Sequence, residues 1–232
     1  MRYSRLLGPV VLAPAAAGVA YWLWRRWGYP VRVLDRAVPS PPSPPIHPAP
    51  EAPGDRPLQT SVEGTGPRFH RTYRVSVAGP TLTPEALIEH IQADIQAFVP
   101  DELARFEKVK GAEDGFRVGD EFDIHISSPW DGPVRVIECG DRSFAFGTLD
   151  GHMEAGQIEF RAEMHDEDRL RFTIESWARS RDAAVDLVYD DLGLAKAAQQ
   201  GMWTFFCKQV AKASGGETVG EIEVVTEREA DA

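Results

Sequence analysis

Apolar and polar residues alternate through most of the chain between Gly115 and Glu175. In the clearest stretch, Phe122, Ile124 and Ile126 take every second position, with charged or polar residues between them. Because successive side chains of a β-strand point to opposite faces, this period of two predicts strands with one buried and one wet face. Glycine, proline and aspartate interrupt the pattern, which indicates an antiparallel meander. We expect its strands near residues 121–126, 134–136, 144–148, 158–164 and 170–175, with a further strand over 67–79.

Two helices accompany these strands. Thr83 predicts an N-cap, and apolar residues then recur at helical spacing until Pro100. A longer helix is expected from Leu192 to the glycine pair at 215–216. The order strand, helix, run of strands, long helix predicts an α+β domain over residues 67–216. In it, a curved antiparallel sheet of about six or seven strands wraps around the C-terminal helix, an arrangement called a helix grip.

An uncharged run of nineteen residues, 6–24, lies near the N-terminus. As a helix it would be about 28 Å long, close to the roughly 30 Å hydrocarbon core of a bilayer. Arginines on both sides and several tryptophan and tyrosine residues favour a retained, single-pass transmembrane anchor over residues 1–27. A cleaved signal peptide and a membrane-surface helix are the alternatives. The arginines on the two flanks lean towards a cytoplasmic domain.

Composition predicts two segments without a packed core. Nine of the nineteen residues from Pro39 to Pro57 are proline, which favours an extended polyproline II spacer. We therefore expect a Pro-rich linker over residues 28–66. The last segment, residues 217–232, is rich in glutamate and is expected to be an acidic, disordered tail.

The formal net charge of −11 argues against a nucleic-acid partner, because phosphate binding relies on clustered lysine and arginine. Cys139 and Cys207 form neither a disulfide framework nor a C-x-x-C motif. A metal site needs three or four converging ligands, and only Asp150, His152 and Glu154 lie close together in the sequence. We therefore predict no cofactor and no metal.

Several motifs resemble a known family. They are VGDEF at 118–122, SPWDGPVRV at 128–136, TLDGHMEAG at 148–156 and SWARS at 176–180. With the order of elements, they resemble the START/polyketide-cyclase (SRPBCC) superfamily, and within it a bacterial family known only as a domain of unknown function. The resemblance covers residues 68–216, and G-H-x-E-x-G is its most specific part. It implies a helix-grip fold whose cavity, between sheet and C-terminal helix, holds a lipid or another apolar molecule.

The first hypothesis is therefore a membrane-anchored module that binds a lipid-like or other hydrophobic small molecule. Aromatic and apolar residues on the faces between sheet and helix would line its cavity. The sequence names no protein partner. The candidate ligand-binding residues are Phe122, Ile124, Trp130, Phe146, His152, Phe160, Phe172, Met202 and Phe205.

Two other functions stay open. His152 is a weak catalytic candidate for an enzyme of the cyclase or hydrolase type, working with Asp150 or Glu154, provided that it points into a cavity. Its competing interpretation is structural, as a residue that fixes a glycine-rich turn. If side chains fill the space between sheet and helix, the domain is instead an interaction or structural domain. We favour binding and lean away from an enzyme.

Overall fold

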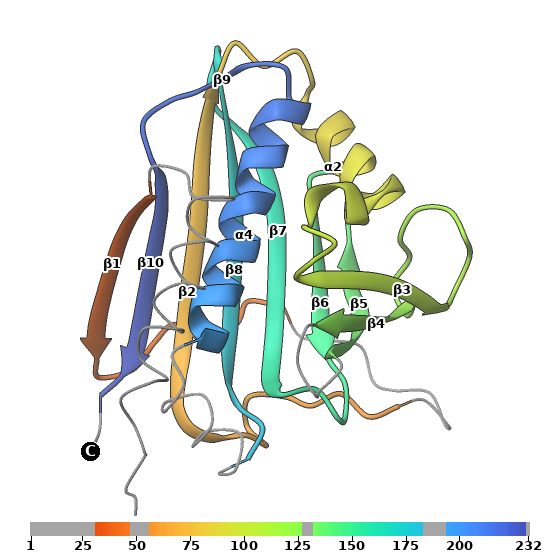
Figure 1. Cartoon of the computed structure of the whole chain (residues 1–232), viewed down its shortest axis with the longest axis vertical. Helices are drawn as coiled ribbons and strands as arrows, with labels where there is room; N and C mark the ends of the chain where they lie inside the picture. The colour runs from red at the N-terminus through yellow and green to blue at the C-terminus, as the bar shows by residue number, and fades with distance from the viewer. Residues whose placement is uncertain (1–30, 47–55, 127–131, 183–193, 231–232) are drawn as a thin grey trace, which may run out of the picture.

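The computed structural model describes residues 31–46, 56–126, 132–182 and 194–230. Within these ranges, ten strands form one sheet in the order β1-β10-β2-β8-β7-β6-β5-β4-β3, and the short β9 pairs with β2. The sheet curls around the long helix α4, which lies along β2 and β8, while α2 packs against β7 (Figure 1). This is the α+β helix-grip arrangement that the sequence predicts.

The strands are β1 Val31–Val38, β2 Thr65–Ala78, β3 Ala104–Lys110, β4 Glu121–Ile126, β5 Gly132–Cys139, β6 Ser143–Thr148, β7 Glu154–Asp166, β8 Arg169–Ser180, β9 Glu217–Thr218 and β10 Ile222–Glu229. The helices are α2 Pro84–Ala93, the 3-10 helix η1 Ile95–Phe98, and α4 Leu194–Ala213.

Alternation along β2 separates an inner face, towards α4, from an outer face. Tyr73, Val75 and Val77 are almost fully buried against the core. Arg74 and Ser76, between them, face the other side of the sheet. The strand predicted over 67–79 is therefore confirmed, and its period of two sets which side chains α4 can contact.

The first helix is shorter than the sequence predicts. Thr83 caps its start, because the Thr83 hydroxyl accepts a hydrogen bond from the Ala86 N–H. The helix ends at Ala93, because Asp94 leaves the helical conformation (φ −152°, ψ 78°) and its side chain accepts a hydrogen bond from the Ala97 N–H. Asp94 therefore ends α2 and begins η1, and the apolar spacing continues across the break.

The prediction of a disordered tail over residues 217–232 is wrong. Most of the tail forms β10, which lies between β1 and β2. Ile222 and Val224 bury almost completely, and Glu229 pairs with Arg68 at 2.8 Å. The glutamate-rich composition masked a period-two strand whose acidic side chains find arginine partners.

The predicted linker over residues 28–66 is also partly wrong. Its residues 31–38 form β1, parallel to β10, and its last two residues begin β2. The sheet has ten strands in place of six or seven because both terminal segments add to it. Neither sequence segment forms a hairpin with its neighbour along the chain, so local turn signals could not reveal the pairing.

No helix within the described residues is long and apolar enough to cross a membrane. The predicted anchor, residues 6–24, lies outside those residues and stays a prediction.

A candidate binding groove beside the C-terminal helix

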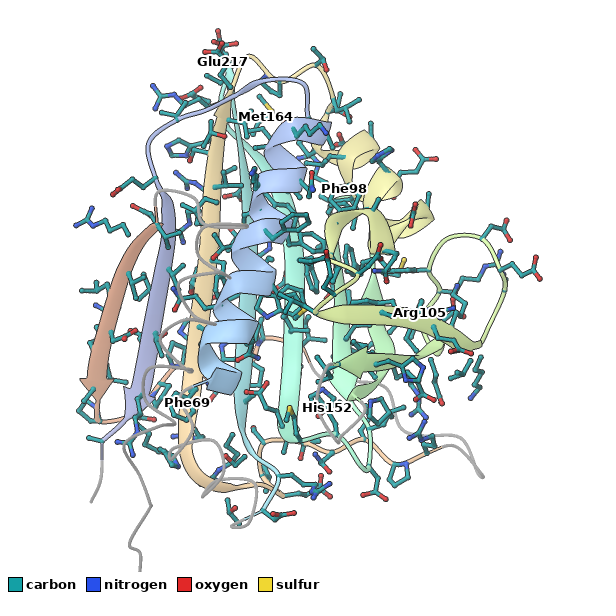
Figure 2. The ribbon with its side chains drawn as sticks, in the orientation of Figure 1. Phe69, Phe98, Arg105, His152, Met164 and Glu217 are labelled. Atoms are coloured by element: carbon teal, nitrogen blue, oxygen red, sulfur yellow. The ribbon has the colours of Figure 1, made fainter. Side chains whose placement is uncertain are left out.

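Aromatic rings fill the space between sheet and α4 at the position where the sequence predicts a cavity. Phe144 and Phe160 stack with their centroids 4.7 Å apart. Phe206 of α4 lies 5.3 Å from Phe160 and 5.8 Å from Phe172, and all four side chains are fully buried. Phe98 of η1 closes this cluster against Phe206 at 5.4 Å (Figure 2). Rings at these distances are in ordinary core contact.

The predicted ligand-binding residues fall into groups that differ in burial. Four of them are buried in this aromatic core: Phe122, Phe146, Phe160 and Phe172. Partly buried are Ile124, Met202 and Phe205, of which the first two pack against the core. His152 lies at the end of the sheet where β7 begins (Figure 2). Trp130 lies outside the described residues.

Strands β10 and β1 extend the sheet beyond α4 (Figure 1). A pocket of about 340 Å³ lies there, on the inner face beside α4. We call it the α4 groove. Phe69 and Tyr73 of β2 give it aromatic walls, and α4 contributes Gln199 and Gln200. The other lining residues are Asp35, Arg36, Ala37, Arg71, Thr226 and Arg228.

A buried polar cluster borders the α4 groove. Arg71, whose side chain lies on the otherwise apolar face of β2, donates from Nη1 to Oε1 of Glu154 at 3.1 Å. Gln199 of α4 donates from Nε2 to Oε2 of the same carboxylate at 3.1 Å. The Arg71 guanidinium also lies 4.6 Å from the centre of the Phe69 ring. Because a buried charge is tolerated only when it is paired, Glu154 explains how Arg71 can occupy this face.

The G-H-x-E-x-G segment, residues 151–156, places Glu154 in that cluster. Gly151 has φ 99°, a conformation that residues with a Cβ rarely adopt. A Cβ on Gly156 would overlap the carbonyl oxygen of Trp177 on β8, so glycine permits the close approach of β7 and β8. The two glycines therefore shape the entry into β7, and the glutamate between them reaches α4.

His152 bonds within its own turn. Its Nδ1 lies 2.8 Å from the Glu154 backbone nitrogen and 2.9 Å from the Glu154 carbonyl oxygen, so the ring closes the turn in either neutral tautomer. Nε2 lies against Gly132, where an added Cβ would be 3.1 Å away. Burial lowers the pKa of His152, so the ring is neutral near pH 7. It does not line the α4 groove, and the condition for a catalytic His152, a position facing a cavity, is not met there.

The sequence did not predict the contacts that hold this turn. The Gln59 side chain donates from Nε2 to the carbonyl oxygens of His152 and Glu154, both at 2.9 Å. The Thr148 hydroxyl donates to the Gln59 carbonyl oxygen at 2.8 Å. These bonds dock part of the predicted linker onto the domain. They leave no periodic signal in the sequence, because they join side chains to backbone atoms far away in the chain.

A second charged cluster lies on the outer face behind the groove. The ring nitrogens of His70 on β2 lie 2.7 Å from Glu227 of β10 and 2.7 Å from Glu175 of β8, and the ring stacks on Trp177. Burial disfavours the charged ring, but hydrogen bonds to both carboxylates outweigh it and raise the pKa of His70. The bond to His70 also lowers the pKa of Glu227. His70 thus ties β10 to the middle of the sheet.

Residues 60–204 match the protein family described as the domain of unknown function DUF1990. The match spans more than half of the chain, and the chain belongs to this family. The resemblance that the motifs carry to a family of unknown function is thereby confirmed. No protein with a curated description matches the chain by sequence.

Three solved structures are similar to this chain in fold and share little sequence with it. The Zhui aromatase/cyclase from Streptomyces sp. R1128 is 16% identical, with a TM-score of 0.48 over 64% of this chain and 94% of that one. Norcoclaurine synthase from Thalictrum flavum, solved with dopamine and hydroxybenzaldehyde, is 11% identical, with a TM-score of 0.45 over 71% and 97%. A hypothetical protein from Helicobacter pylori is 12% identical, with a TM-score of 0.46 over 62% and 86%.

Proposed function

We propose that this domain binds a small molecule with an aromatic or lipid-like body and an acidic group, and that the α4 groove is its site. The pocket of about 340 Å³ walled by Phe69 and Tyr73 carries the proposal. Small-molecule sites are concave, mostly apolar, and about 300–1,000 Å³ in volume. The groove is at the small end of that range, so we expect a compact ligand or one end of a longer lipid.

Charge favours an acidic group on the ligand. Two arginines whose side chains lie on the inner face, Arg71 and Arg228, line the α4 groove together with one carboxylate, Asp35. Arg36 also lines it, but its guanidinium pairs with Glu227 on the outer face. Arg71 is held in place by Glu154 and by the Phe69 ring, so little side-chain freedom is lost when a ligand arrives. A guanidinium in fixed position is suited to a carboxylate, which it can bind through two parallel hydrogen bonds.

The test is a calorimetric titration of the full chain with 2-naphthoate, an aromatic carboxylate. We expect saturable binding that Phe69→Ala weakens by at least about tenfold, since the substitution removes an aromatic wall. Phe205→Ala is the matched control, because Phe205 is also partly buried but does not line the groove. Binding that survives Phe69→Ala and is lost in Phe205→Ala would contradict the proposed site. Absence of saturable binding to the unaltered chain would contradict the proposed probe class.

The filled aromatic core supports a second candidate function, an interaction or structural domain. Phe144, Phe160, Phe172 and Phe206 are fully buried and touch one another, as in a core that has no guest. This candidate predicts that no apolar or aromatic acid binds the full chain, whereas the first predicts binding at the α4 groove. The same titration separates the two.

We also propose that residues 6–24 anchor the domain to a membrane as a single span, with the domain on the cytoplasmic side. The length of the uncharged run and its aromatic flank support an anchor. The full chain is expected to resist alkaline carbonate extraction from membranes, and a chain without residues 1–27 to be released. Protease treatment of intact cells tests the side. An intact mass lacking the first twenty or so residues would contradict the anchor and indicate a signal peptide.

A further inference from the structure

The outer face of the sheet carries a second pocket, of about 450 Å³, which none of the predicted ligand-binding residues lines. Three arginines from three strands line it: Arg32 of β1, Arg74 of β2 and Arg171 of β8. Ser76 of β2 and residues 219–221, in the turn before β10, also line it. We call this the arginine pocket.

Pairing in the sheet brings these cations together. Arg32 and Arg74 both lie beside Glu223 of β10, one on each side of it. Arg171 lies beside Ser76, two residues along β2 from Arg74. Arg74 and Arg171 are therefore diagonal neighbours on the same face of adjacent strands, where long side chains reach one another. Like charges at that spacing repel, so a bound anion would relieve the repulsion.

The arginines are incompletely matched by the carboxylates near them. The Nη1 atom of Arg74 lies 3.6 Å from Glu223, and that of Arg171 lies 3.9 Å from Glu163, both beyond hydrogen-bond distance. Within the described part of the chain, the Nε atoms of Arg74 and Arg171 are buried and have no hydrogen-bond partner. Buried donors are nearly always satisfied, so these two guanidinium groups are incompletely hydrogen-bonded. The Arg74 and Arg171 side chains as a whole are 39% and 27% exposed, so an anion in the pocket would meet them through their other guanidinium nitrogens.

We propose that the arginine pocket binds an oxyanion, and that a phosphate group is the best match. A phosphate oxygen cluster accepts hydrogen bonds from several guanidinium groups at once, and the Ser76 hydroxyl adds a neutral donor. Two glutamates, Glu221 and Glu223, also line the pocket. They leave the lining with an excess of positive charge and limit the ligand to a small anionic group, since a larger polyanion would meet both carboxylates.

The first test is a calorimetric titration of the full chain with inorganic phosphate, against sodium chloride of equal ionic strength. The unaltered chain is expected to bind phosphate saturably, and Arg74→Gln and Arg171→Gln each to weaken it by at least tenfold. Arg169→Gln is the matched control. Arg169 is on the same strand and face as Arg171, pairs with Asp166, and does not line the pocket, so its variant is expected to bind as the unaltered chain does.

A second variant separates specific donors from bulk charge. Arg171→Lys keeps the positive charge but replaces the planar set of guanidinium donors by one ammonium group, and we expect the same tenfold loss. If Arg171→Lys binds phosphate as tightly as the unaltered chain, the guanidinium donors play no part in binding the anion and the proposal is overturned. Equal phosphate affinity in all the variants, or no saturable binding to the unaltered chain, overturns it as well. Thermal unfolding of each variant without phosphate verifies that it is folded.

Two soluble probes identify the source of the phosphate group. Glycerol 3-phosphate represents a free phosphate ester, and dibutyryl phosphatidic acid represents a lipid headgroup. Similar affinity for both supports a free ester, and binding at least tenfold tighter to the phosphatidic acid supports a lipid. If Arg74→Gln leaves the affinity for both probes unchanged, the arginine pocket is not their binding site. Phosphate is not expected to displace 2-naphthoate, because the two pockets lie on opposite faces of the sheet.

Discussion

The two halves of the inner face of the sheet differ in what α4 presents to them. Towards β7 and β8, α4 presents Phe206, which meets the rings of Phe160 and Phe172 in a filled core. Towards β2, β10 and β1, the N-terminal half of the same helix presents Gln199 and Gln200, and a groove remains. A helix-grip fold can therefore close its interior with aromatic side chains and leave room at the edge that its terminal strands build.

The boundary between the two halves is polar. Arg71 and Glu154 lie there with 7% and 14% of their side chains exposed, and Gln199 joins them from α4. Water is largely excluded from such a pair, so both partners must be present for either to be tolerated. The cluster thus separates a dry core from a groove that solvent and ligands can reach.

The largest effect is expected from removing the wall of the groove. Deletion of residues 221–232 removes Ile222 and Val224, whose burial stabilises the fold by roughly 3–6 kcal/mol in total, and leaves β2 as an unprotected edge. Loss of cooperative urea unfolding or aggregation of the truncated chain is the expected result. The matched point variants are Val224→Ala on the inner face and Val225→Ala on the outer face. Equal stability of these two would contradict the assigned faces of β10.

Truncation in the filled half comes next. Phe160→Ala is expected to lower the free energy of unfolding by about 4 kcal/mol, because the ring leaves a cavity in a packed core. Phe205→Ala, at a partly exposed position of α4, is expected to cost less than half as much. Urea denaturation measures both. A loss below about 1 kcal/mol in Phe160→Ala would show that the core is not filled.

Breaking the boundary cluster has a somewhat smaller effect. Arg71→Ala or Glu154→Ala is expected to cost about 3 kcal/mol, since each leaves its partner's charge buried and unpaired. The double variant is expected to cost less than the sum of the two, and the difference measures the coupling. Arg68→Ala, which breaks a more exposed pair with Glu229, is the control and is expected to cost about 0–1 kcal/mol. If the loss in the double variant equals the sum of the two single losses, Arg71 and Glu154 do not interact.

The smallest effect is expected in the pH dependence of stability, through His70 and Glu227 on the outer face of the sheet behind the groove. The pKa of His70 is raised above its ordinary value of 6.5, so its contribution to stability is complete below pH 6.5 and is lost as pH rises through the pKa of the folded state. The pKa of Glu227 is lowered below 4.5, so its contribution is present above pH 4.5 and is lost in acid. The contact with Glu175 and Glu227 is therefore strongest between these values.

Urea denaturation at pH 5.5 and pH 8 measures the contribution of His70 to the free energy of unfolding. The loss of stability between the two pH values is expected to be smaller in His70→Gln than in the unaltered chain, because glutamine does not titrate. An unchanged difference between the two pH values would mean that His70 does not carry the pH dependence.

Sequence patterns predicted the central fold well and the edge of the sheet poorly. Period-two alternation identified the central strands because each has one face against a core, as in Tyr73, Val75 and Val77. The pairing of β1 with β10 joins residues almost two hundred positions apart. No turn motif in the sequence can indicate a contact between segments so far apart. Composition predicted a linker and a disordered tail for these two segments, because their proline and glutamate content outweighed a short alternation of apolar and polar residues.

The candidate site shows the same division. In the G-H-x-E-x-G segment the sequence favours His152 as the chemical candidate, whereas in the structure Glu154 makes the contacts with Arg71 and Gln199. The one charged residue on the apolar face of β2, Arg71, was the available signal for the groove. Aromatic residues such as Phe160 fit a cavity wall and a packed core equally well in sequence, and only their mutual distances distinguish the two.

The most direct measurement is the change in amide chemical shifts when 2-naphthoate is added to the ¹⁵N-labelled full chain. Binding in the groove predicts that the largest changes fall on Tyr73, Gln200 and Thr226, which line it. The amides of Phe146 and Phe160 in the filled half are expected to change little. The opposite distribution, with the largest changes at Phe146 and Phe160, would contradict the account. It would show that the ligand binds between the sheet and α4, in a space that the account describes as filled.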